Sequence, residues 1–87
     1  MVQPVDPRSR DSKWLQVADQ IRGLIASGRY APGEHLPSND DLAYATETSV
    51  PTVRRALRAL ALEEIIATEQ GIRAQVAIPR ERVVERL

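Results

Sequence analysis

Three arginines, Arg54, Arg55 and Arg58, lie in the segment SVPTVRRALRAL, residues 49–60, which contains no acidic side chain. The planar guanidinium group of arginine can donate two parallel hydrogen bonds to a phosphate or to the O6 and N7 atoms of guanine. The residue type and the spacing are therefore those of a surface that binds nucleic acid. An amphipathic helix must also place polar residues on its outer face, so a solvated helix face is an alternative explanation.

The apolar residues of the same segment predict the element that carries the arginines. They recur at spacings of three and four residues, which is typical of one face of an α-helix, and at about 100° per residue the arginines fall outside that face. Ser49 is a suitable N-cap and Pro51 is tolerated in the first turn, so we expect a helix over residues 50–62. Its inward residues are Val53, Ala56, Leu57, Leu60 and Ala61.

The composition is that of a small folded protein with no net charge. The chain has 87 residues, 43% of them hydrophobic, and its 12 basic residues balance 12 acidic ones. A partner attracted by bulk charge is not expected, whereas a partner that contacts one basic face remains compatible with this balance. The absence of cysteine excludes disulfides and thiolate metal sites. No apolar run approaches the roughly 18 residues of a membrane span and no signal peptide opens the chain, so we expect a cytoplasmic protein without a membrane partner.

The N-terminal part of the chain predicts an arm and a first helix. We interpret residues 1–12 as a flexible arm because they contain two prolines and no periodic apolar pattern. Helical spacing begins near Lys13, where Ser12 is a candidate cap, and Gly28 is placed to end this helix.

A turn and a second helix follow. Pro32 and Gly33 are typical of a type II turn, and residues 34–36 are long enough only for an edge strand. Ser38 is a candidate cap for the second helix, whose early acidic residues suit the positive end of the helix dipole. Residues 46–48 break the pattern before the helix that carries the arginines.

Beyond the third helix, two apolar runs predict a β-hairpin. They are IIAT and AQVAI, residues 65–68 and 74–78, and EQGIR separates them with Gly71 at the tip. Residues 79–87 are expected to form a C-terminal tail in which a short helix can begin. The folded domain is therefore expected to span residues 13–78.

The order of elements is helix, short strand, helix, helix and hairpin, which describes a winged helix-turn-helix. We expect a mainly α fold of three helices with a two- to three-stranded antiparallel sheet as the wing. In this geometry the outer face of the helix over residues 50–62 enters the major groove of double-stranded DNA. The wing, at residues 69–73, then reaches the adjacent backbone or minor groove. Only one face meets the DNA, so local positive charge is sufficient.

Two longer segments carry a resemblance to a known family. They are VADQIRGLIASGRYAPGEHLPSNDDLA and SVPTVRRALRALALEEII, followed by QG at the wing tip. With these segments the chain, from about Trp14 to Val76, resembles the N-terminal DNA-binding domain of the GntR family of bacterial transcription regulators. The resemblance implies a sequence-specific DNA-binding transcriptional regulator, and we expect it to be a repressor.

The resemblance also implies where DNA is contacted: at the start of the second helix, at the start and face of the third helix, and at the wing tip. Ser49, Thr52, Arg54 and Gly71 match the family at these positions. The candidate DNA-binding set is completed by Ser38, Val50, Arg55, Arg58, Gln70 and Arg73. For Gln70, a merely polar residue in a hairpin turn is an equally good explanation.

The chain departs from the family pattern at four positions. Asp40 and Val50 stand where the family usually has arginine, and Glu47 and Arg73 stand where it usually has glycine. One interpretation is an altered operator, with Val50 on a thymine methyl group and other arginines supplying the charge. The alternative is a winged-helix module with weakened DNA binding that contacts a protein, such as an assembly factor or a phage- or plasmid-borne modulator. We favour altered DNA recognition.

Other functions receive little support from the sequence. Nothing resembles a nucleophile–base pair, a phosphate loop or a metal cluster, so we expect neither catalysis nor a cofactor nor a bound metal. Trp14 and Tyr44 are predicted to pack in the core or in partly buried positions. Family members usually continue into an effector domain, whereas this chain ends just past the wing. We therefore expect no small-molecule effector site, in either a stand-alone regulator or a fragment. A homodimer would bind a palindromic operator.

Overall fold

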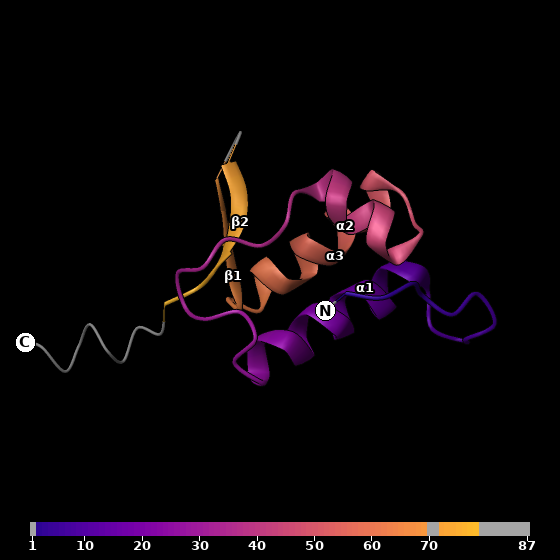
Figure 1. The fold of residues 1–87 in the computed structure, drawn as a ribbon, viewed down its shortest axis with the longest axis horizontal. Helices are drawn as coiled ribbons and strands as arrows, with labels where there is room; N and C mark the ends of the chain where they lie inside the picture. Colours follow the sequence, from indigo (N-terminus) through magenta and orange to yellow (C-terminus); the bar gives the residue numbers. More distant parts are fainter. Residues whose placement is uncertain (1, 70–71, 79–87) are drawn as a thin grey trace, which may run out of the picture.

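The computed structural model of the chain describes residues 2–69 and 72–78, and it has the predicted order of elements (Figure 1). The predicted wing-tip residues Gln70 and Gly71 and the predicted tail at 79–87 lie outside the described residues. The described elements are α1 (Lys13–Ala26), α2 (Asn39–Thr46), α3 (Val50–Leu62), β1 (Ile66–Glu69) and β2 (Ile72–Val76). None of the described helices is long and apolar enough to cross a membrane.

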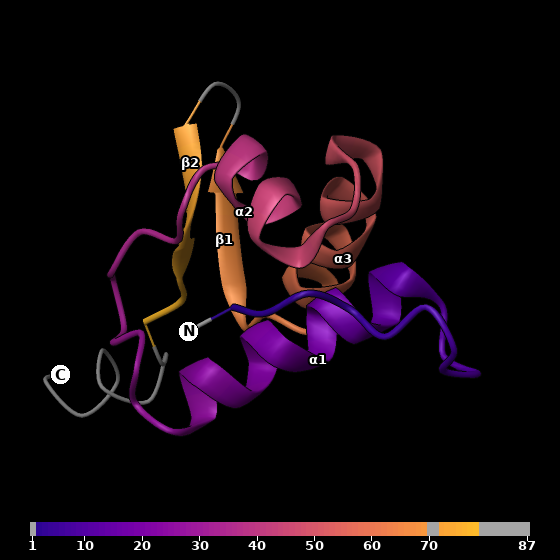
Figure 2. The ribbon, with the colours of Figure 1, turned by 45° about the vertical axis from the view of Figure 1, so that its right-hand side comes forward.

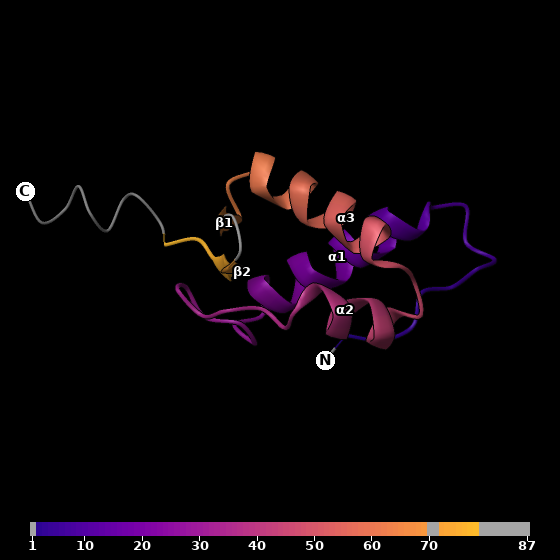
Figure 3. The same ribbon diagram turned by 90° about the horizontal axis from the view of Figure 1, so that it is seen from above.

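The core lies where α3 packs on α1, with α2 and the hairpin closing it from two sides (Figures 2 and 3). The predicted inward face of α3 is buried except for Ala61, which is half-buried. Each leucine, isoleucine or valine removed from water in such a core contributes about 1.5–3 kcal/mol. The core residues with no measurable exposure are Val17, Ala18, Ile21, Leu36, Val53, Ala56 and Leu60.

The wing is a two-stranded antiparallel sheet, and the predicted edge strand contributes a single bridge to it, between His35 and Gln75. Its backbone still hydrogen bonds to β2, because the Leu36 amide donates to the Ala74 carbonyl oxygen at 2.8 Å. The preceding turn is type II as predicted, with Gly33 at φ +84° and the Glu34 amide donating to the Ala31 carbonyl oxygen at 2.9 Å. The wing is thereby tied to the loop that leads into α2. The strand register is Ile66 to Val76, Ala67 to Gln75 and Glu69 to Ile72.

Residues 2–6, in the segment that the sequence predicts to be a flexible arm, pack against the helices, whereas residues 7–12 are exposed. The Val5 amide donates to the Thr46 carbonyl oxygen at 3.0 Å, and the Val5 side chain is buried. Gln20 on α1 exchanges two hydrogen bonds with the backbone of Gln3, at 2.7 and 2.8 Å. Gln16, one turn earlier on α1, exchanges two with the backbone of Asp6, at 2.8 and 2.9 Å.

The physical reason is that a glutamine side-chain amide both donates and accepts, as the backbone of a neighbouring β-strand would. Gln16 also uses its second N–H, which donates to the Asp11 carbonyl oxygen at 3.1 Å. The backbone groups of Gln3 and Asp6 and the Val5 amide are therefore hydrogen bonded without regular secondary structure. A search for apolar periodicity does not detect such a contact, because it depends on polar side chains of another element.

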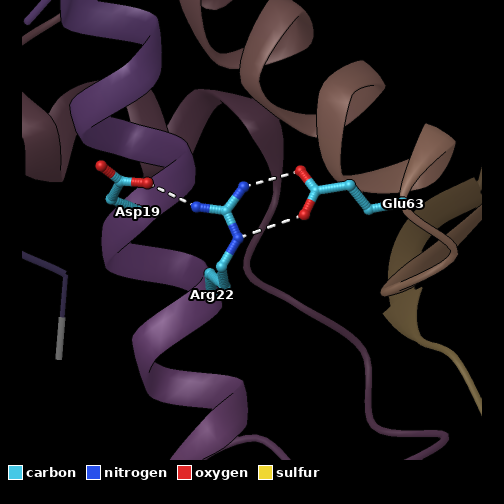
Figure 4. Close-up of polar contacts among 3 residues, drawn as sticks. All are labelled: Asp19, Arg22 and Glu63. Carbon is cyan, nitrogen blue, oxygen red and sulfur yellow. Dashed lines mark hydrogen bonds and ion pairs between the residues drawn. The ribbon is translucent and has the colours of Figure 1, made fainter.

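Arg22 connects α1 to the end of α3. Its guanidinium group donates to Glu63 from Nε at 3.3 Å and from Nη2 at 2.6 Å, and it also pairs with Asp19 (Figure 4). Hydrogen bonding to Glu63 raises the pKa of Arg22 above its ordinary value, because the charged guanidinium group is the form that this contact favours. The three side chains are more than one third exposed, and pairs this exposed contribute at most about 1 kcal/mol.

The turn between α2 and α3 is built around Thr46 and Glu47. Thr46 is fully buried, and its hydroxyl donates to the Leu42 carbonyl oxygen at 2.7 Å and hydrogen bonds with the Thr48 hydroxyl at 2.8 Å. Helix α2 therefore continues through a threonine that the sequence pattern assigns to the break. Glu47 then has φ 57° and ψ 42°, a left-handed conformation in which its Cβ is crowded.

We predict that Glu47→Gly stabilises the protein by about 0.5–1 kcal/mol. Relief of the left-handed penalty, about 1–2 kcal/mol, exceeds the entropy cost of a new glycine, about 0.5–1 kcal/mol. Urea unfolding measures the change. Ala45→Gly, inside α2, is the control and should destabilise by about 1 kcal/mol. Equal destabilisation by both substitutions would contradict a strained turn.

Candidate nucleic-acid interface

Helix α3 buries one face and exposes the arginines on the other. Arg54, Arg55 and Arg58 are all exposed, as the sequence predicts. In the part of the chain that the structure describes, the ion pairs are those of Arg22, so these three guanidinium groups have no carboxylate partner. Their hydrogen-bond donors are therefore available to an external acceptor.

A groove of about 600 Å³ joins α3 to the start of α2 and to the wing. We call it the arginine groove; Figure 2 shows the elements that form it, with the wing beside the first turn of α2. It brings together five predicted DNA-binding residues from three elements far apart in the sequence: Ser38, Val50, Arg54, Arg58 and Arg73. Arg73 is exposed on β2 and extends the positive charge of α3 onto the wing.

The candidate set omits six residues that also line the arginine groove. Three of them are apolar, Leu57, Ala61 and Ala74, and three are polar, Asn39, Asp40 and Thr68. Asn39 and Asp40 are the first two residues of α2, directly after its cap, and Thr68 lies on β1 near the wing tip. The sequence does point to position 40, because Asp40 stands where the family usually has an arginine, whereas Asn39 and Thr68 have no signal beyond their nearness to predicted contact residues. The groove thus offers donors, acceptors and one carboxylate to a ligand.

Arg55 lies on the other side of the arginine stripe, toward α1. Its guanidinium carbon is 4.8 Å from the centre of the Trp14 ring, within the range of a cation–π interaction. Lys13 and Thr52 line the same hollow. Trp14 is half-buried, in agreement with the prediction. Arg55 therefore borders two hollows, one that it shares with Arg54 and Arg58 and one that it shares with Trp14, which periodicity alone does not reveal.

The prediction for Tyr44 is wrong, because its side chain is 87% exposed. The inward face of α2 is formed by Leu42, Ala43 and Thr46, all buried. At about 100° per residue, Tyr44 falls roughly opposite to this face. A helix of eight residues has room for only one inward stripe, and the aromatic ring lies outside it.

The predicted serines have a structural role that the structure shows directly. The Ser38 hydroxyl oxygen accepts from the Asp41 amide at 3.1 Å, and that of Ser49 accepts from the Thr52 amide at 3.3 Å. The Ser49 and Thr52 hydroxyl groups also hydrogen bond to each other at 3.0 Å. Both helices that form the groove therefore begin at capped termini.

The family model of bacterial regulatory proteins of the gntR family matches residues 13–76. The chain belongs to the GntR family. The fold class expected from the sequence, a winged helix-turn-helix of GntR type, is confirmed.

Individual GntR relatives and structural neighbours support this assignment. The mannosyl-D-glycerate transport/metabolism system repressor MngR of Escherichia coli is 43% identical over 58 residues, which are 67% of this chain and 24% of MngR. The chain therefore spans about a quarter of the length of that relative. The GntR-family transcription factor YtrA from Sulfolobus acidocaldarius is 32% identical, with a TM-score of 0.82 over 99% of this chain and 90% of that one. The DNA-binding domain of AraR, in complex with operator ORX1, is 26% identical, with a TM-score of 0.79 over 88% and 95%.

We predict that Ser49→Ala lowers the free energy of unfolding by about 1 kcal/mol, because it removes the acceptor for an amide in the first turn of α3. Ser12→Ala is the matched control. Ser12 occupies the N-cap position of α1, but its side chain makes no capping hydrogen bond, so its loss should be smaller. Urea unfolding of both variants tests this. Equal losses would show that Ser49 does not stabilise α3 through its hydroxyl group.

Proposed function

We propose that this chain acts as a sequence-specific DNA-binding transcriptional regulator of GntR type, and as a repressor. The observation that carries the proposal is the arginine groove, in which unpaired Arg54 and Arg58 of α3 face the same space as Arg73 of the wing. Helix α3, residues 50–62, would enter the major groove of double-stranded DNA. The wing, with its tip at residues 69–73, would lie on the adjacent backbone or minor groove.

The arginines receive different roles in this proposal. Arg54 and Arg58 line the arginine groove and are assigned to guanine edges, which accept two hydrogen bonds from one guanidinium group. Arg55 is assigned to a phosphate, because it stacks on Trp14 and lies near Lys13, a second cation. Phosphate contacts of this kind position the protein without selecting a sequence.

The relatives support both parts of the proposal, repression and the binding of operator DNA. MngR is a repressor, and the AraR domain is in complex with an operator. The zero net charge is compatible with DNA binding, because phosphates are neutralised by the lysines and arginines that contact them, which lie on one face. The proposed role is binding without catalysis, metal or cofactor, in the compartment that holds the DNA, the cytoplasm.

We predict that Arg54→Ala and Arg55→Ala weaken DNA binding in different ways. A preferred duplex is first selected from a randomised pool and then compared with a scrambled duplex by fluorescence anisotropy at several salt concentrations. Arg54→Ala should cost about 1–3 kcal/mol on the preferred duplex and much less on the scrambled one. Arg55→Ala should weaken both and reduce the slope of log K against log salt by about one.

Arg29→Ala is the control for loss of one positive charge, because Arg29 is exposed in the loop after α1 and lines neither site. It should leave both affinities nearly unchanged. An Arg54→Ala/Arg55→Ala double variant with wild-type affinity would refute the assignment of α3 as the recognition helix. Weak binding of wild type, equal for all duplexes, would favour a protein partner on the same face. The number of protein copies bound per selected duplex shows whether the protein binds a palindromic operator as two copies.

A further inference from the structure

One carboxylate lies in the arginine groove. Asp40, the second residue of α2, is exposed and lines this groove together with Arg54, Arg58 and Arg73. In the described parts of the chain it pairs with none of these arginines, since the ion pairs there all involve Arg22. The groove therefore presents both free guanidinium donors and a free carboxylate acceptor to whatever occupies it.

A carboxylate at this place is unfavourable if the groove only holds phosphates. Two like charges repel each other over the distances of such a contact, so Asp40 would lower the affinity for any duplex, whatever its sequence. The edge of a base pair is a different ligand, because it offers amino groups as well as acceptors. In the major groove the N4 amino group of cytosine donates to aspartate or glutamate, and the guanine of the same pair accepts from arginine.

The structural role of an acid at the start of α2 is already filled by Asp41. Its amide is the one that the Ser38 hydroxyl group caps, and Asp41 also lies in the first turn, where a negative charge favours the helix dipole. Asp41 does not line the arginine groove. The two adjacent aspartates therefore differ in the one respect that matters for DNA, which is access to the groove.

We propose that Asp40 is a specificity-determining residue that accepts a hydrogen bond from the N4 amino group of a cytosine in the major groove. The inference rests on the proposed function and deepens it by naming the base-pair class that the groove selects. An arginine of the groove binds the O6 and N7 atoms of guanine while Asp40 accepts from cytosine. Repulsion of phosphates by Asp40 also lowers non-specific binding, which increases the ratio between specific and non-specific affinity.

The test is a selection from a randomised duplex pool with wild type, Asp40→Asn and Asp41→Asn, followed by affinity measurements on the selected duplexes. Asp40→Asn should lose the preference for cytosine at one position per bound copy, a change of between about 5-fold and 150-fold, and should shift it toward adenine. Asp41→Asn removes the same charge from the same helical turn and should keep the wild-type preference. Thermal unfolding shows that all three proteins are folded.

A chemical variant of the DNA sharpens the comparison. Replacing the selected cytosine by a pyrimidine without the 4-amino group should weaken wild type and leave Asp40→Asn nearly unaffected. If both aspartate variants strengthen binding to every duplex and keep the wild-type base preference, Asp40 acts only as a repulsive charge and the inference is wrong. This outcome differs from a failure of the proposed function, in which wild type itself shows no base preference and Arg54→Ala changes nothing.

Discussion

The packing of one face of α3 on α1 is the interaction on which the rest of this small structure depends. The helix has only 13 residues, and four of them are buried against the rest of the domain. Because the same helix supplies the core and carries the arginines, its rotation about its own axis is fixed by the core. The direction in which the arginines point is therefore set by Val53, Ala56, Leu57 and Leu60 rather than by the arginines themselves.

Two devices hold the ends of this helix in place. Ser49 satisfies an amide at its beginning, and the ion pair between Arg22 and Glu63 ties its end to α1 (Figure 4). Neither is strong, since a cap contributes about 1 kcal/mol and an exposed pair no more than that. These two contacts instead keep α3 in position. If the helix were displaced, its arginines would move away from the wing residue Arg73.

The elements of the fold were predictable from the sequence because each has a local signal: apolar periodicity for α1 and α3, serine caps for α2 and α3, and glycine for the turn at Gly33. The contacts of the N-terminal segment were not predictable, because they are made by Gln16 and Gln20 across the space between two elements. The site was predictable in part. Arg54 and Arg58 are exposed on α3 as expected, whereas the groove that they line and the stacking of Arg55 on the Trp14 ring depend on other elements.

The hydrogen bond from Val5 to Thr46 couples the start of the polypeptide to the turn that sets the angle between α2 and α3. The first residues therefore belong to the folded unit in a mechanical sense, although a family comparison that begins at residue 13 does not include them. When DNA-binding domains are exchanged between regulators, the transferred segment should therefore include the residues that make this hydrogen bond. A chimaera joined at α1 would carry the recognition helix but lose part of what orients it, whereas one joined ahead of Val2 would keep the contacts of Val2, Gln3 and Val5.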